Sequence, residues 1–407
     1  MAEASLKLGG SWGVKEGSLL GFNDENGNYK PIPFDFTRTT TATRVNRNGL
    51  IEEVQSGVPR IDFSNGDGSL LLEPQRTNLE SNSELLGTYS NAIIRLANNT
   101  TSPEGLINAN KIVEAATTDR HELYSDSIGF NGTTHTISFF AKADERRYIS
   151  AFVGGNPATG GATFDLQTGT ISQTSGGTTA NVEDYGNGWY RCSFTTTYSI
   201  TSQVYLCMRT TDSNVGVESY TGDGTSGFYI WGLQVEAGSY ATSYIPTSGS
   251  AVTRNQEDMD TVFSNAISTD GNASYFIHLE GSNYSSNMTS QGASFNFTGG
   301  DYIAYNVNNS GYHRIRANID GNANYYATDV YKTEEAKILT IINGTNIKVF
   351  VNGVEKKDET LVGTPDLASA SGFTTSVSDA LGELPITQIM LFSTALTDEE
   401  AIALTTL

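Results

Sequence analysis

The sequence predicts an all-β protein with an irregular N-terminal segment, two β-sandwich domains and one short helix at the C-terminal end. Glycine (42 residues), tyrosine (20) and phenylalanine (18) are abundant, while charged residues make up only 17% of the 407-residue chain. Short apolar runs alternate with Asn-Gly and Asp-Gly pairs, which favour tight hairpin turns. Several runs also alternate apolar and polar residues with the period of two that is typical of half-buried strands.

The chain is long enough for more than one domain, because 407 residues correspond to two or three units of roughly 150 residues. We divide it into residues 1–82, 83–247 and 255–407. The last boundary follows the small polar residues 247–250. Residues 1–82 hold too few apolar residues for a sizeable core, so we expect this segment to gain burial from partner chains.

The charge of the chain argues against several partners. Its formal net charge is −21 and its pI is about 4.5, whereas a nucleic-acid-binding protein needs a basic stripe. No run approaches the roughly 18 consecutive apolar residues of a membrane-spanning helix. The first residues lack the basic and apolar regions of a secretory signal. We therefore expect no nucleic-acid partner and no membrane insertion.

The most specific stretch lies near the N-terminus. Residues 36–78 read FTRTTTATRVNRNGLIEEVQSGVPRIDFSNGDGSLLLEPQRTN and contain no nucleophile cluster, metal-ligand spacing or phosphate-binding glycine loop. The stretch closely resembles a segment of fibre and appendage proteins of tailed bacteriophages, where it links a particle-attachment region to carbohydrate-binding-like modules. The resemblance implies that residues 1–82 attach to other virion proteins of the capsid or tail, and that the virion is assembled in the host cytoplasm.

Residues 83–247 predict the first sandwich. Apolar and polar residues alternate most clearly at 136–141 and 189–195. Further strands are expected at 148–153, 161–166, 204–208 and 227–236. The phrases HTISFFAKAD, GNGWYRCSFT and FYIWGLQVEAGSYATSYIPTSGSAVTR are similar to the carbohydrate-binding-like jelly roll that follows the FTR segment in phage fibres. The resemblance implies the same fold here.

Four aromatic residues of this domain could serve as core or as platforms for sugar rings: Trp189, Tyr190, Trp231 and Tyr244. Trp189 and Trp231 lie within apolar strands, so we expect them inside the sandwich. Tyr190 should then point to the opposite face, because successive side chains of a strand alternate. Tyr190 is therefore a candidate glycan contact.

The two cysteines, Cys192 and Cys207, lie in expected strands on either side of a turn near residues 199–201. A tight hairpin would place them opposite each other, where a disulfide is geometrically possible. Assembly in a reducing cytosol favours two buried thiols instead. Neither has a histidine nearby in the sequence, so we expect no catalytic role for them.

The last domain predicts a second sandwich. Residues 337–357, KILTIINGTNIKVFVNGVEKK, place two apolar strands around an Asn-Gly turn. The ending PITQIMLFSTALTDEEAIALTTL predicts a strand and then a helix over 397–404, with Thr397 as N-cap and Glu400 completing a capping box. These phrases resemble the concanavalin A-like (laminin-G-like) sandwich, although Tyr331-Lys332 stands where that family usually has a tryptophan.

The best candidate for ligand binding is the stretch DYIAYNVNNSGYHRIR at residues 301–316, which Tyr325-Tyr326 follows. Aromatic faces beside planar hydrogen-bonding groups are features that glycan recognition uses. An ordinary sheet surface or a subunit interface would explain the same residues. The candidate contacts in this domain are Tyr302, Tyr305, Tyr312, Arg314 and Arg316.

Nothing in the sequence predicts catalysis, a metal or a cofactor. Retaining glycosidases need two carboxylates about 5–5.5 Å apart, and the Glu-x-Asp-x-x-Glu pattern that supplies them from one strand is absent. The acidic groups at 257–260, 334–335 and 398–400 are read as linker, turn and helix start. The histidines lack metal-ligand spacing: His121, His135, His278 and His313.

Two functions remain. The first is a bacteriophage virion structural protein, a head or tail fibre or appendage, that binds host-surface or environmental glycans without catalysis. The second is a purely structural capsid-decoration or tail component whose lectin-like folds serve as spacers. A polysaccharide depolymerase is less favoured, because no carboxylate pair is evident. Phage fibres that resemble this chain are usually homo-oligomers, and we expect a trimer.

Overall fold

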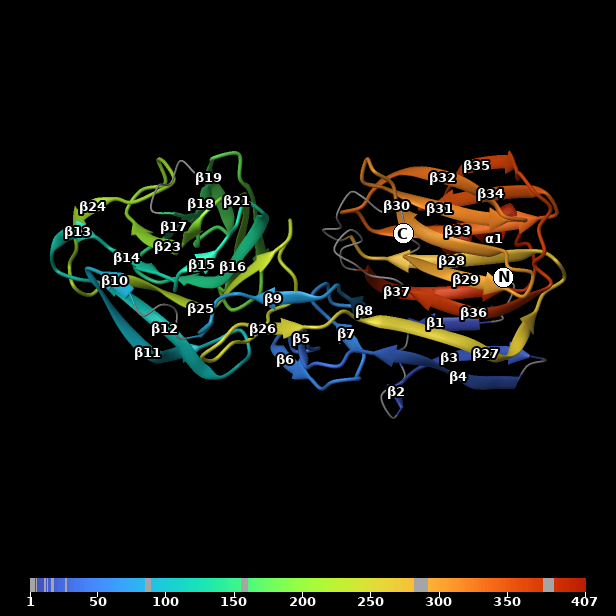
Figure 1. The fold of residues 1–407 in the computed structure, drawn as a ribbon, viewed down its shortest axis with the longest axis horizontal. Helices are drawn as coiled ribbons and strands as arrows, with labels where there is room; N and C mark the ends of the chain where they lie inside the picture. The colour runs from blue at the N-terminus through green and yellow to red at the C-terminus, as the bar shows by residue number, and fades with distance from the viewer. Residues whose placement is uncertain are drawn as a thin grey trace. The chain divides into compact units, whose positions relative to one another are not determined.

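A computed structural model confirms the all-β prediction (Figure 1). It describes residues 4, 6–10, 12, 14–15, 18–25, 28–84, 89–154, 160–281, 292–375 and 384–407. The chain forms two compact units, which we call the terminal unit (residues 1–41, 54–75 and 255–407) and the middle unit (residues 42–53 and 76–254). The chain passes from one unit to the other four times, after residues 41, 53, 75 and 254.

The middle unit is a sandwich of two six-stranded antiparallel sheets. The first sheet has the order β10 (Tyr89–Asn91), β14 (Glu122–Tyr124), β23 (Val204–Arg209), β17 (Tyr148–Val153), β18 (Gly161–Asp165), β19 (Thr170–Ser175). The second has the order β11 (Ile93–Thr101), β12 (Ile107–Glu114), β25 (Gly227–Ala237), β16 (Thr134–Ala143), β21 (Tyr190–Thr197), β20 (Thr179–Asp184). Phe139 of β16 and Phe164 of β18 meet edge to face across the two sheets, with ring centroids 5.8 Å apart.

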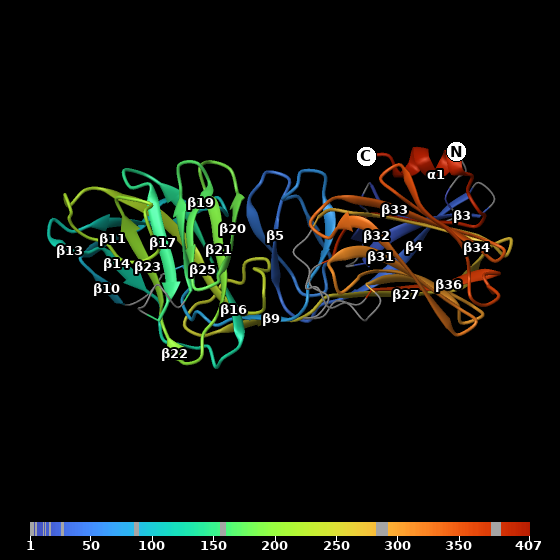
Figure 2. The same cartoon turned by 90° about the horizontal axis from the view of Figure 1, so that it is seen from above.

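Short two-stranded sheets accompany these two six-stranded sheets. They are β13 (Thr118–Arg120) with β24 (Ser219–Thr221), β15 (Ile128–Gly129) with β22 (Thr201–Ser202), β5 (Ala42–Val45) with β6 (Ile51–Val54), and β9 (Arg76–Asn78) with β26 (Val252–Arg254). Figure 2 shows the same elements from above. The pairing of β9 with β26 joins the entry and the exit of the middle unit.

The tight hairpin that would have placed the two cysteines opposite each other is absent. Strand β21, which holds Cys192, pairs with β16 and β20, whereas β23, which holds Cys207, pairs with β14 and β17. The chain therefore crosses from one sheet to the other between the two residues, as it does in sandwiches with Greek-key connections. Both cysteines are buried free thiols, and burial raises the pKa of each.

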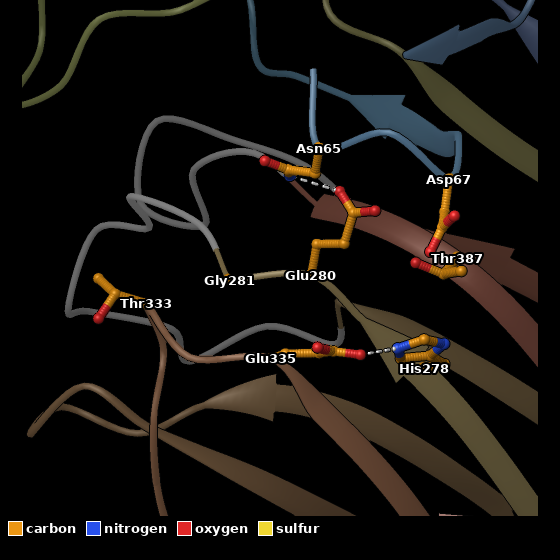
Figure 3. A pocket seen from close by; sticks show the side chains of 8 residues that line it. All are labelled: Asn65, Asp67, His278, Glu280, Gly281, Thr333, Glu335 and Thr387. Carbon is orange, nitrogen blue, oxygen red and sulfur yellow. Dashed lines mark hydrogen bonds and ion pairs between the residues drawn. The ribbon is translucent and has the colours of Figure 1, made fainter. Parts of the chain in front are cut away.

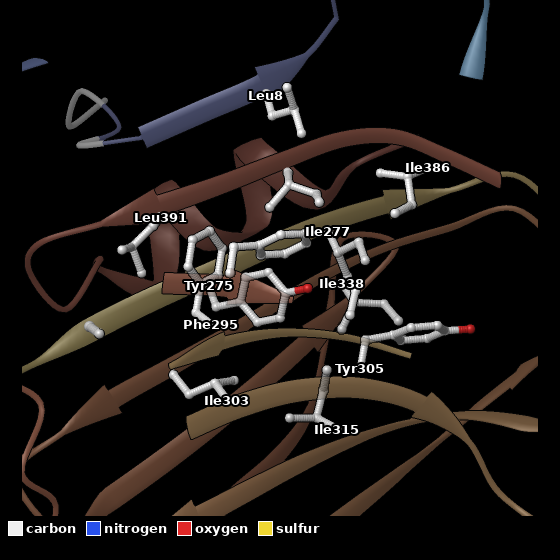
Figure 4. Packing of buried hydrophobic residues seen from close by; sticks show 14 of the residues in the cluster. Leu8, Tyr275, Ile277, Phe295, Ile303, Tyr305, Ile315, Ile338, Ile386 and Leu391 are labelled. Carbon is white, nitrogen blue, oxygen red and sulfur yellow. The ribbon is translucent and has the colours of Figure 1, made fainter. Parts of the chain in front are cut away.

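The terminal unit is a second sandwich. One sheet has the order β35 (Val354–Thr360), β34 (Asn346–Val351), β33 (Ala336–Asn343), β28 (Ala273–Leu279), β37 (Leu384–Phe392). The other has the order β27 (Asp258–Ser268), β36 (Ser369–Thr375), β29 (Ala293–Phe297), β30 (Tyr302–Val307), β31 (Tyr312–Ile319), β32 (Asn322–Tyr331). Their inner faces enclose one large apolar core (Figure 4).

Strands from the N-terminal region join these two sheets along one side. They are β1 (Leu6–Gly9), β2 (Val14–Lys15), β3 (Ser18–Glu25), β4 (Asn28–Thr37), β7 (Arg60–Asp62) and β8 (Ser69–Leu72). Strand β1 pairs with β37 and with β3, β3 pairs with β4, and β4 pairs with β27. The hydrogen-bonded ladder thus runs from the first sheet into the second without an open edge on this side.

This arrangement corrects the expected separation of residues 1–82 from the second sandwich. Leu6, Leu8, Phe34 and Leu70 are buried in the same core as the residues of β28 and β33. Figure 4 shows Leu8 pointing into the interior that holds Tyr275. The segment indeed lacks a core of its own, but residues 255–407 of the same chain supply the missing burial.

The predicted C-terminal helix is confirmed as α1 (Asp398–Thr405). The Thr397 side chain accepts a hydrogen bond from the Glu400 backbone N–H at 3.2 Å, and the Glu400 carboxylate accepts one from the Thr397 N–H at 3.2 Å. This is the expected capping box. Ala401 then packs with Phe350 and Leu339 on the outer side of the terminal-unit sheet that contains β33 and β34.

Four buried charges hold the N-terminal strands to the start of β27. Arg38 Nη1 lies 2.6 Å from Glu257 Oε1, Arg60 Nε donates to the same oxygen at 2.7 Å, and Arg60 Nη2 lies 2.8 Å from Glu73 Oε2. We call these four residues the ion cluster; their side chains are at most 1% exposed. Burial opposes the charge of Arg60, but the carboxylates of Glu257 and Glu73 outweigh it and raise its pKa.

The middle unit also holds a buried polar network. Asn78 Nδ2 donates to the carbonyl of Ile245 at 2.9 Å, and its Oδ1 accepts from the N–H of Val235 at 3.0 Å. Glu236 accepts from the N–H and the hydroxyl of Thr242 at 2.9 and 2.7 Å. The polar residues of the FTR, RIDF, LLLEPQRTN and LQVEAGSYATSYIP phrases are therefore largely buried and paired.

Replacing Glu257 by glutamine should destabilise the terminal unit by about 3–5 kcal/mol, because two buried arginines would lose a charged partner. Calorimetric unfolding of the full chain would measure this change as a lower melting temperature. Glu52→Gln is the matched control, because Glu52 and Arg44 form a partly exposed ion pair at 2.7 Å that should contribute at most about 1 kcal/mol. Equal effects of the two substitutions would contradict the role given to the ion cluster.

Candidate functional site

The candidate site lies on the outer face of β30, β31 and β32. In β31 the odd-numbered positions from 313 to 319 are buried, and Arg314 and Arg316 between them are partly exposed. Arg316 is paired across the ladder with Tyr325 of β32 and with Ala304 of β30. Because successive side chains alternate between the faces of a sheet, this register brings aromatic and guanidinium groups from three strands onto one face.

Two tyrosines and two arginines stack on this face, and we call Tyr302, Arg314, Arg316 and Tyr325 the Tyr–Arg surface. The guanidinium carbon of Arg314 lies 4.6 Å from the centroid of the Tyr325 ring. The guanidinium carbon of Arg316 lies 5.5 Å from the same centroid and 5.2 Å from that of Tyr302. These cation–π contacts restrict long side chains that would otherwise be mobile, so the surface is organised before any ligand arrives.

The charged side chains within β30, β31 and β32 are two arginines and one aspartate. Arg314 Nε donates to Asn306 Oδ1 at 2.7 Å, while burial and the charge of Arg316 lower the pKa of Arg314. Asp329 is the only carboxylate within β30, β31 and β32, and it accepts a hydrogen bond from Lys356 Nζ at 2.9 Å, which lowers its pKa. The two arginines therefore set the charge of the Tyr–Arg surface.

Two of the predicted contacts are not members of the Tyr–Arg surface. Tyr305 is fully buried in the core, and its hydroxyl is hydrogen-bonded to His313 Nδ1 at 2.7 Å. Strand alternation turns it away from Tyr302, so Tyr305 cannot meet a sugar from the solvent side. Tyr312 is 37% exposed and shares the outer face of β31 with Arg314 by alternation, but a bulge in β32 separates their partners, and Tyr312 packs edge-on against Tyr331 with ring centroids 5.5 Å apart.

The structure also corrects the expected orientation of Tyr190. Trp189 and Trp231 are buried as expected, but they form an apolar cluster with Ile51 that is separate from the main core of the middle unit. Tyr190, the first residue of β21, packs against the main core and covers Gly169. Because Trp189 belongs to the other cluster, alternation turns Tyr190 inward, toward the main core of the middle unit, instead of outward.

The sequence analysis noted the pair Tyr325-Tyr326 but did not predict which of the two side chains is exposed. Tyr325 is 50% exposed and Tyr326 is 5% exposed. The period-two pattern of exposed and buried residues along β32 places the first tyrosine outside and the second in the core. This alternation was the signal that could have identified Tyr325 as the exposed ring.

A second feature, which sequence reasoning missed, is a polar cavity of about 280 Å³ in the terminal unit. It is lined by Asn65, Asp67, His278, Glu280, Gly281, Thr333, Glu335 and Thr387 (Figure 3). Glu280 accepts hydrogen bonds from Asn65 Nδ2 at 2.6 Å and Ser69 Oγ at 3.1 Å, and His278 Nε2 lies 2.8 Å from Glu335 Oε1. Its residues come from four distant stretches of sequence, so no local motif marks it.

Two further properties of the described residues bear on function. They contain no group of three or more His, Cys, Asp or Glu side chains that could hold a metal ion. None of the helices in the described ranges is long and apolar enough to cross a membrane.

No protein-family model matches this chain, and no curated protein matches it. Among solved structures, the carbohydrate-binding module CBM40 of the Ruminococcus gnavus IT-sialidase, bound to α2,3-sialyllactose, is 14% identical, with a TM-score of 0.25 over 33% of this chain and 82% of that chain. Domain 4 of the Geobacillus stearothermophilus arabinanase AbnA, in complex with arabinotriose, is 13% identical, with a TM-score of 0.29 over 41% and 83%. A pentraxin from Limulus polyphemus is 10% identical, with a TM-score of 0.30 over 37% and 75%. Likenesses this weak carry no conclusion about this chain.

Lowering the pH from 7 to 4.5 should weaken the sheet beneath the Tyr–Arg surface. Burial lowers the pKa of His313 from 6.5 to about 4, so the unfolded chain binds more protons than the folded chain between these values. The stability that neutral His313 provides is complete above pH 6.5 and is lost as the pH falls toward 4. His313→Gln should therefore reduce the acid-induced loss of stability by about 2 kcal/mol in urea unfolding. An unchanged pH dependence would contradict this assignment.

Proposed function

We propose that this chain is a structural protein of a bacteriophage virion, a head or tail fibre or appendage, that binds host-surface or environmental glycans without catalysis. The observation that supports glycan binding is the half-exposed ring of Tyr325 beside Arg314 and Arg316 on a sheet face. The C–H face of a sugar packs against an aromatic ring, and guanidinium N–H groups donate to sugar oxygens. The Tyr–Arg surface offers both kinds of contact side by side.

The affinity of one such site should be low. The Tyr–Arg surface is an open sheet face, and an open face buries less of a ligand than an enclosed pocket does. Several copies on one particle would raise the effective concentration for rebinding and so compensate for weak single sites. A repeated polysaccharide is the kind of ligand that such an arrangement suits.

The virion role rests on the resemblance of residues 36–78 to phage fibre segments. Three polar residues of that stretch, Arg38, Arg60 and Glu73, belong to the ion cluster. A buried charge cluster constrains its residues more strongly than an exposed loop does, because each charge needs its partner. A sequence that matches at these positions is therefore expected to share the arrangement, which supports the comparison with phage fibres.

The proposed partners are other virion proteins of the capsid or tail, which residues 1–82 would contact after synthesis in the host cytoplasm. A homo-oligomer, with a trimer favoured, follows from the resemblance. It does not follow from unburied apolar surface, because Leu6, Leu8 and Phe34 are already buried within the chain. No nucleic acid and no membrane insertion are proposed.

A purely structural role is the second candidate. The observation that favours it is the gathering of tyrosines and arginines on one outer sheet face, because these residue types are enriched at protein interfaces. In that case the two sandwiches would act as spacers and contacts within a capsid or tail. Glycan binding separates the two candidates.

Substituting Tyr302 and Tyr325 together by alanine should weaken glycan binding at least about tenfold, which corresponds to ~1.4 kcal/mol. Binding to a panel of host and environmental polysaccharides, measured with the full chain by affinity electrophoresis, would show the loss. Tyr305→Phe is the control, because this buried residue loses a hydroxyl but no surface. Failure of every glycan to bind the wild-type chain would favour the structural role.

The purified protein should release no reducing ends from the polysaccharides that it binds. The carboxylates of the polar cavity, Glu280 and Glu335, bond to different partners on different sides (Figure 3), and hydrolysis needs an acid and a second carboxylate that flank the same bond. Sustained release of reducing ends, lost in a Glu280→Gln and Glu335→Gln variant, would contradict the proposal and support a depolymerase.

A further inference from the structure

We infer that the Tyr–Arg surface selects glycans that carry carboxylate groups, such as polymers of uronic acids. The inference rests on the proposed glycan-binding function and adds the chemical class of the sugar. The charged residues of β31 have the opposite sign to the net charge of the whole chain. The chain carries a formal net charge of −21, yet this face of β31 presents Arg314 and Arg316 with no acidic residue on the same strand.

The two arginines are placed so that their charges add. They are two residues apart on the same face of β31, which corresponds to roughly 6–7 Å along an extended strand. Like charges at this separation repel each other. An anion bound beside both of them removes that repulsion, so the bare surface favours a negatively charged ligand over a neutral one.

Arg316 keeps its charge available on this face. Among the described residues it forms no ion pair, and its contacts are the rings of Tyr302 and Tyr325. Its Nε is buried and has no hydrogen-bond partner in the same set. Arg146 behaves differently, because its Nη2 lies 2.5 Å from the Glu114 carboxylate. Stacking on aromatic rings holds the Arg316 guanidinium in place without neutralising it.

The neighbouring aromatic ring indicates where the anion sits on the sugar. The guanidinium carbon of Arg316 lies 5.5 Å from the centre of the Tyr325 ring. A sugar stacked on Tyr325 would therefore bring a carboxylate bonded directly to its own ring within reach of Arg316. The planar guanidinium fork matches the two oxygens of a carboxylate, which gives two parallel charge-assisted hydrogen bonds.

The test uses the full chain and three uronate oligomers, derived from polygalacturonate, alginate and hyaluronan, each also as its neutral methyl ester. The ester keeps the sugar ring and removes the charge. We expect at least one acid form to bind about tenfold or more tightly than its ester, and this preference should shrink as salt is raised. Arg316→Gln should abolish the preference. Arg316→Lys, which keeps the charge but loses the fork, should retain only part of it.

Arg120→Gln is the control, because it removes one exposed positive charge from the middle unit and should leave the preference intact. Thermal unfolding of each variant shows whether it is folded. Acid and ester forms that bind equally well, and that both lose affinity in Tyr325→Ala, would overturn the inference and leave the proposed function standing. Dextran sulfate binding as tightly as the acid forms would overturn the preference for carboxylates. Absence of all glycan binding would remove the proposed function and the inference together.

Discussion

The buried ion cluster of the terminal unit is the interaction on which the placement of the N-terminal region depends. Arg38, Arg60, Glu73 and Glu257 come from four separate stretches of the chain, and each is enclosed away from water. A buried pair adds little net stability when complete, but loss of one partner leaves a costly charge behind. We therefore propose that the cluster acts mainly on specificity, because the arrangement that brings the four segments together pairs all four charges.

Much of the fold was predictable, because its signals are local. Period-two alternation and Asn-Gly turns located strands in both sandwiches, and the capping pair Thr397 and Glu400 located α1. The assignment of residues 1–82 was not predictable in this way, because three of its strands also pair with partners hundreds of residues away, as Leu6 does with Leu391. The positions of Cys192 and Cys207 in two different sheets were also not predictable, because adjacency in sequence does not reveal that a chain crosses between sheets.

The stretch of residues that forms most of the candidate site was predictable, but which of its side chains face the solvent was not. Residues 301–316 contain three of the four members of the Tyr–Arg surface, and composition alone pointed to them. Which tyrosines face outward depends on register, so Tyr305 was misplaced and Tyr325 was left out of the candidates. The polar cavity could not have been found from the sequence, because Asn65 and Glu280 meet there only after the N-terminal strands join the second sandwich.

The Tyr–Arg surface lies on the outer face of a sheet whose inner face is part of the core of the terminal unit. On the inner face of the same strands, the buried side chains of His313 and Tyr305 are hydrogen-bonded to each other. On the outer face, the guanidinium groups of Arg314 and Arg316 stack on the rings of Tyr302 and Tyr325. We propose that this face contacts the sugar. A crystal structure of the full chain with a bound oligosaccharide tests it most directly. We expect a sugar ring on Tyr325 with a polar group against Arg316, whereas a sugar in the polar cavity or on the middle unit alone would contradict the claim.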